Sequence, residues 1–173
     1  MRGPSVHQFA GVAEAALPSG ALLGRYQAAN SYTDCFVATV PGCIAQAAFI
    51  EAFYTTTLFK LERLALAVLL RRPSSDPEVR RLATGQASGF AAWTVEAREA
   101  EQILLRDFMG ASRSWLMSVE DSVACATTLY FGTALLPPPG RGRLGSGFRA
   151  LIPLHRPYAR ALLRSAVRRL KSV

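Results

Sequence analysis

The feature that most constrains the fold is a long amphipathic segment at the C-terminal end of the chain. Its apolar residues and one histidine recur at spacings of three and four, the period of one helix face. This apolar stripe consists of Phe148, Leu151, Ile152, His155, Tyr158, Ala159, Leu162, Leu163, Ala166, Val167 and Leu170. A long amphipathic helix can cover the open face of a sheet, so the segment predicts a helix packed on a sheet. Pro153 and Pro157 interrupt the stripe, and we expect the regular helix to begin only near Pro157, after a bent turn.

The opposite face of this predicted helix is basic. Its cations are Arg149, Arg156, Arg160, Arg164, Arg168 and Lys171. The whole chain has 20 Lys and Arg against 12 Asp and Glu, a net charge of +8. A solvated outer face explains the basic residues, and contact with an anionic membrane surface is the alternative. The chain contains no aromatic-interleaved basic motif, so we predict no specific nucleic-acid partner.

The middle of the chain carries the period of two that is typical of β-strands. Tyr32 to Val40 combines aromatic and β-branched residues and ends at Pro41-Gly42, a turn signal. Four more strands are expected within residues 91–98, 103–108, 113–119 and 127–136. Because their connections are short, these strands must form antiparallel hairpins. The sequence therefore predicts an antiparallel sheet of five strands.

Between the first strand and the other four, the apolar period becomes helical. Two helices are expected within residues 43–71, with a break at Thr55 to Thr57 and Thr56 as the N-cap of the second helix. A short third helix begins at Ser75, where Glu78 gives the spacing of a capping box, and Gly85 is its expected stop. We therefore predict an α+β protein in which two to three helices follow the first strand.

The length of 173 residues fits one compact domain. We assign residues 31–173 to this domain and residues 1–30 to a weakly specified N-terminal lead-in, which is rich in Ala, Gly, Pro and Ser. No stretch has the pattern of a signal peptide or a transmembrane helix, so we expect a cytoplasmic protein. Cys35, Cys43 and Cys125 have neither disulfide nor metal-ligand spacing. We predict no metal and no cofactor.

Five short motifs occur in order along the predicted sheet and final helix. They are Trp93-Thr94-Val95, Ile103-Leu104-Leu105-Arg106, Gly110 with Ser114-Trp115-Leu116, Thr128-Leu129-Tyr130 and Pro153-Leu154-His155. Together with the order of elements, this succession resembles the helix-grip fold of the START and birch-allergen superfamily, also called SRPBCC. It resembles in particular a bacterial family of unknown function that is often fused to short-chain-reductase-like domains. The resemblance covers roughly residues 88–170 and implies a curved sheet that grips the long C-terminal helix, with a cavity between them. A cone-shaped α+β fold of the nuclear-transport-factor type is the structural alternative.

Such a cavity implies a small apolar or amphipathic ligand, because ligand sites combine apolar walls with a few polar groups. The ligand-binding candidates are Trp93, Arg98, Arg113, Trp115, Tyr130 and His155. Two of the arginines have structural alternatives. Arg98 can form a solvated cross-strand pair with Glu96. Arg113 can form an ion pair with Asp107, and otherwise it could anchor a ligand carboxylate.

His155 lies within the apolar stripe and supports an alternative, enzymatic function. A neutral imidazole can act as a general base near pH 7, and Asp107, Glu96 or Tyr130 could share cyclase- or hydratase-like acid–base chemistry with it. A core histidine bonded to a backbone carbonyl is the structural alternative, and no Asp or Glu lies within four residues of His155 to orient it. Ligand binding is therefore the leading hypothesis. The alternatives are such an enzyme and a protein that interacts with a membrane surface.

Overall fold

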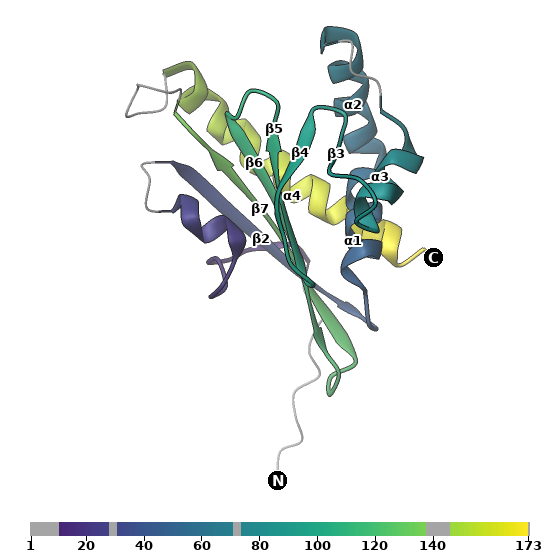
Figure 1. Cartoon of the computed structure of the whole chain (residues 1–173). Helices are drawn as coiled ribbons and strands as arrows, with labels where there is room; N and C mark the ends of the chain where they lie inside the picture. The colour runs from purple at the N-terminus through teal and green to yellow at the C-terminus, as the bar shows by residue number, and fades with distance from the viewer. Residues whose placement is uncertain (1–10, 28–30, 71–73, 138–145, 173) are drawn as a thin grey trace.

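The computed structural model describes residues 11–27, 31–70, 74–137 and 146–172 of the chain. These residues form an α+β protein in which a C-terminal helix crosses one face of a seven-stranded antiparallel sheet (Figure 1). The strands are β1 (Ala13–Glu14), β2 (Tyr32–Pro41), β3 (Gly89–Phe90), β4 (Trp93–Arg98), β5 (Gln102–Asp107), β6 (Ser112–Asp121) and β7 (Ala126–Leu135). The helices are the short 3-10 helix η1 (Leu22–Tyr26) and the α-helices α1 (Gln46–Tyr54), α2 (Thr57–Leu70), α3 (Asp76–Ala83) and α4 (Ser146–Leu170).

The strands lie in the order β1-β2-β7-β6-β5-β4-β3 across the sheet. Its centre consists of the long strands β2, β7 and β6. Tyr32 of β2 and Ser112 of β6 both lie opposite Leu135 of β7, and the two pairings run along the strand as far as Ala126. Because β7 returns beside β2, the first and last long strands of the chain are neighbours. Helices α1, α2 and α3 lie in the sequence between β2 and β3.

The five predicted strands correspond to β2, β4, β5, β6 and β7, and the structure adds β1 and β3. Each of the added strands has only two residues, too few to show an alternating pattern. Residues 11–27, which belong to the predicted lead-in, contain β1 and η1. Residues 1–10 and 28–30 of that lead-in lie outside the described residues.

The predicted break between the first two helices is confirmed, because α1 ends at Tyr54 and α2 begins at Thr57. The Thr56 hydroxyl accepts a hydrogen bond from the backbone N–H of Phe59 at 3.2 Å, as an N-cap does. The capping box of α3 is also present, with Ser75 and Glu78 as its members. Local hydrogen bonds therefore set the starts of both helices.

The prediction that the final helix becomes regular only near Pro157 is wrong. Helix α4 begins at Ser146 and contains both Pro153 and Pro157. A proline removes one helical hydrogen bond and tends to bend the helix. Both prolines are exposed, so the disturbance lies on the side of α4 away from the core, and the buried face continues.

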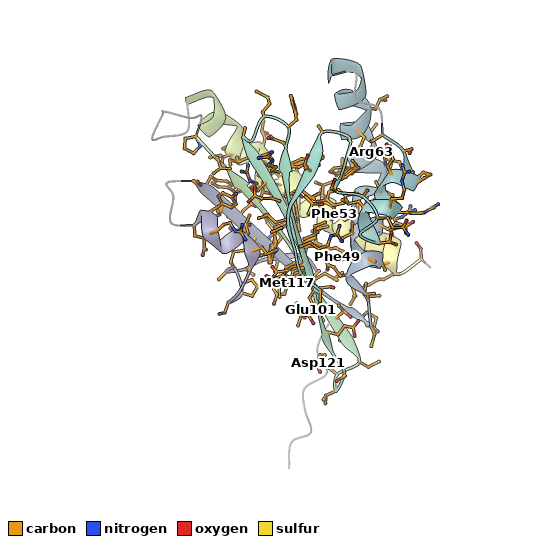
Figure 2. All side chains as sticks on the ribbon, in the orientation of Figure 1. Phe49, Phe53, Arg63, Glu101, Met117 and Asp121 are labelled. Atoms are coloured by element: carbon orange, nitrogen blue, oxygen red, sulfur yellow. The ribbon has the colours of Figure 1, made fainter. Side chains whose placement is uncertain are left out.

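Alternate strand positions build two separate cores, one on each face of the sheet. On the inner face, which α4 covers, side chains such as Phe36, Leu105 and Phe131 pack against α1 and α4. Phe49 and Phe53 of α1 lie in this layer (Figure 2). On the outer face, a smaller core contains Leu22 and Leu23 of η1, Cys35, Leu104, Trp115 and Ala134. Both faces of the sheet are therefore covered.

Of the helices that the structure describes, none combines the length and the apolar character needed to cross a membrane.

Candidate functional site

A cavity of about 370 Å³ lies between the inner face of the sheet and α4. Its mainly apolar wall consists of Phe53, Phe59, Trp93, Phe131, Leu135, Tyr158 and Leu162. Polar residues at its border are Asp107, Ser112, Arg113, Ser114, Thr133 and His155. The residues come from α1, α2, β4, β5, β6, β7 and α4, so elements far apart in the sequence build the cavity together. The volume falls within the usual range of small-molecule sites.

Asp34 of β2 forms a buried polar cluster beside this cavity. Its side chain is only 2% exposed, and its Oδ2 lies 3.4 Å from His155 Nε2. The Asp34 carboxylate accepts a hydrogen bond from the Tyr32 hydroxyl at 3.1 Å and another from the Thr133 backbone N–H at 3.0 Å. The cluster therefore brings a carboxylate, an imidazole and a phenol together at one end of the cavity.

Burial dominates the electrostatics of the cluster. It raises the pKa of the Asp34 carboxyl, although the nearby His155, Tyr32 and Thr133 act in the opposite direction. Burial and the adjacent Asp34 charge also raise the pKa of the Tyr32 hydroxyl, which therefore stays protonated at neutral pH. An Asp34 side chain whose pKa is raised can exchange a proton with the imidazole beside it more readily than an exposed carboxylate can.

Three buried polar atoms of the cavity-lining residues lack a hydrogen bond within the described part of the chain: Trp93 Nε1, Thr133 Oγ1 and His155 Nε2. Thr133 Oγ1 and His155 Nε2 both approach the Asp34 carboxylate without reaching hydrogen-bond alignment. The serines differ, because Ser114 bonds to Tyr54 and Ser112 bonds to Asp107. Buried polar atoms are normally satisfied, so these three retain an unused hydrogen-bonding capacity at the cavity.

The structure places three predicted ligand-binding residues at the cavity, namely Trp93, Arg113 and His155. Asp107, a predicted catalytic residue, also borders it. The Asp107 carboxylate accepts bonds from the Ala111 and Ser112 backbone N–H groups and from the Ser112 hydroxyl, so it stabilises the turn between β5 and β6. The carboxylate next to His155 is Asp34.

Trp115 and Tyr130 do not line the cavity, contrary to the sequence prediction. Both lie on the outer face, where Trp115 is fully buried and its Nε1 donates to Gln102 Oε1 at 2.9 Å. Arg98 is also away from the cavity, because its guanidinium donates to the backbone carbonyl of Leu82. The two tryptophans differ because Trp93 of β4 packs against the inner core, whereas Trp115 of β6 lies in the outer core together with the neighbouring Tyr130 of β7.

Glu96, a predicted catalytic residue, does not line the cavity either. The pairing of β4 with β5 shifts between Val95 and Ala97, and this bulge leaves Glu96 unpaired in the ladder. Glu96 contacts Arg113 at 2.5 Å and also accepts a hydrogen bond from the Tyr26 hydroxyl. The structural ion pair predicted for Arg113 is therefore present, but with Glu96 in place of Asp107. The Arg113 guanidinium forms this ion pair and also lies over the Tyr26 ring, 5.0 Å from the ring centroid.

The sequence analysis did not select Asp34, the carboxylate of the polar cluster beside the cavity. The signal was its position, since Phe36, Ala38 and Val40 follow it at alternate positions of β2 and face the inner core. A carboxylate in such a series is costly to bury unless it has partners.

The chain matches no known protein family, no curated protein and no solved structure. Among the described residues, no group of three or more His, Cys, Asp or Glu side chains could hold a metal ion.

Proposed function

We propose that the protein binds a small apolar or amphipathic molecule in the cavity between the sheet and α4, as a helix-grip domain of the SRPBCC type. The observation that carries the proposal is the composition of the cavity wall. Large apolar side chains such as Phe53, Phe131 and Leu162 line most of it. Two buried polar atoms without a hydrogen bond, Thr133 Oγ1 and His155 Nε2, belong to residues that contact Asp34 at one end of the cavity.

This distribution favours a ligand with an apolar body and one polar group. The apolar body would replace contact with water by contact with aromatic and aliphatic side chains. The polar group would lie near Thr133 and His155, with Trp93 Nε1 as an additional donor. A hydroxyl or a carbonyl suits this end better than a carboxylate, because a second carboxyl group next to the buried Asp34 would make it unfavourable for both to ionise.

Binding of the neutral fluorescent dye phenylnaphthylamine tests the proposal. A Leu135→Phe substitution adds volume at the cavity wall, and we expect it to weaken dye binding roughly tenfold through overpacking. Val119→Phe is the matched control, because Val119 lies on the outer face of β6, away from the cavity. Equal dye affinities of the two variants, or no saturable binding by the wild type, would contradict the proposal.

A second candidate function is acid–base catalysis on the bound molecule. The observation that favours it is the pair formed by His155 and Asp34, whose closest atoms are 3.4 Å apart beside the cavity. In this function His155 would accept a proton from the substrate, and Asp34 would hold the imidazole and stabilise its charged form. The proposal is compatible with cyclase- or hydratase-like chemistry.

Exchange of the carbon-bound protons of cyclohexanone for deuterium, followed by NMR, tests this second function. We expect the protein to accelerate exchange next to the carbonyl, and His155→Gln to remove about a hundredfold of that acceleration. Dye binding measured on the same variant separates loss of chemistry from loss of the cavity. Exchange that is no faster than in protein-free buffer, or that is unchanged in His155→Gln, would reject the enzymatic function.

A further inference from the structure

A second cleft lies on the opposite side of α4 from the cavity. Its volume is about 450 Å³, and its cations are Arg156, Arg160 and Arg164 of α4. The other residues of its lining are Glu14 of β1, Phe36 of β2, and Pro157 and Ala161 of α4. The cavity and the cleft share no lining residue, because they use different sides of the helix.

The charges in this cleft do not balance. Three arginines and one glutamate leave two positive charges, and Glu14 is already paired with Arg156. Neither Arg160 nor Arg164 has an ion pair with another described residue. Arg160 instead lies over the Phe36 ring, 6.0 Å from its centroid. Like charges one helical turn apart repel each other, so an anion between them would relieve an unfavourable interaction.

We infer that this cleft binds a phosphate group carried by an organic molecule. Guanidinium groups pair with phosphate through parallel hydrogen bonds, and a phosphomonoester carries close to two negative charges at neutral pH. That charge equals the excess of the cleft. Pro157 and Ala161 of α4 also line the cleft and supply a small apolar surface against which the organic part of the molecule can pack. This site is independent of the cavity and of the function proposed for it.

Titration with phenyl phosphate at low ionic strength, followed by NMR or calorimetry, tests the inference. We expect saturable binding by the wild type and a loss of roughly tenfold in affinity for Arg160→Gln and for Arg164→Gln. Glu14→Gln should strengthen binding, because it releases Arg156 and removes the one acid among the described residues that line the cleft. Arg168→Gln is the matched control, since Arg168 is an exposed arginine of the same helix outside the cleft.

Vesicles distinguish a soluble phosphate ester from a lipid headgroup. Phosphatidylcholine vesicles with and without phosphatidic acid are compared in a sedimentation assay. Phenyl phosphate binding without sedimentation assigns the site to a soluble ester, whereas sedimentation that requires phosphatidic acid, Arg160 and Arg164 assigns it to a headgroup. The inference fails if neither probe binds, or if Arg168→Gln weakens binding as much as Arg160→Gln does.

Discussion

At the scale of single residues, Asp34 combines two opposing effects. Burial disfavours its charged form, whereas the nearby His155 and the hydrogen bonds from Tyr32 and the Thr133 backbone favour it. The balance leaves the pKa of Asp34 raised above the unfolded value of 3.8. A raised pKa means that the folded protein binds the proton more tightly than the unfolded chain does. Stability from this group is therefore fully present below the unfolded pKa and is lost as the pH rises through the folded pKa.

The Asp34→Asn substitution tests this sign. An asparagine at this position does not ionise, so the variant should not lose the stability that the wild type loses between the unfolded and the folded pKa of Asp34. We expect the free energy of unfolding of the wild type, relative to that of Asp34→Asn, to be highest at low pH and to fall towards neutral pH. Urea unfolding of both proteins across this range measures the difference.

Asp76 provides a control of opposite sign. Partial burial raises the pKa of Asp76, but the pairing with Lys60 and Arg63 outweighs burial, and the net pKa is lowered. The stability that Asp76→Asn loses relative to the wild type should therefore grow as the pH rises from the lowered folded pKa towards the unfolded value of 3.8, and stay constant at higher pH. A wild-type advantage over Asp34→Asn that stayed constant or grew with pH would contradict the account of Asp34.

At the scale of elements, the long periodic segments were predictable because their physical signals are local. The apolar stripe that ends at Leu170 identified α4, and alternation identified the five longer strands. The hydroxyl of Thr56 and the capping box at Ser75 marked helix starts without any tertiary information. The start of α4 was misplaced, because the rule for proline ignores whether its side of the helix is exposed.

Which residues line the cavity depends on how the strands pair, and a single sequence does not show that pairing. Alternation shows that Trp93 and Val95 share a face, but not that Trp115 of another strand faces the opposite way. The sequence also did not predict the bulge at Glu96, the residue with which Arg113 pairs instead of the expected Asp107. For the same reason, the sequence analysis did not predict the pairing of His155 with Asp34. Their closest atoms are 3.4 Å apart, but the two residues are separated by most of the chain in the sequence.

At the scale of the whole molecule, the two faces of the sheet have different roles. The inner face contributes to the cavity, and the outer face packs against η1. Gln102 connects η1 to the sheet, because its Oε1 accepts hydrogen bonds from the Leu22 backbone N–H and from Trp115 Nε1. Helix η1 is therefore part of the packed structure, and the sheet separates the two cores.

Gly132 of β7 lies where these parts meet, and its replacement tests how closely they pack. A Cβ added at Gly132 would lie 2.7 Å from Leu23 Cδ2, 2.8 Å from the Asp34 carbonyl oxygen and 3.1 Å from Trp115 Cε3. Leu23 can rotate, but the β2 backbone must shift. We therefore expect Gly132→Ala to cost about 1–3 kcal/mol, a melting temperature lower by roughly 2–10 °C in calorimetry. Gly24→Ala is the control, because no atom lies within 4 Å of its added Cβ. Equal melting temperatures for the two variants would mean that η1 and the sheet pack more loosely than the structure indicates.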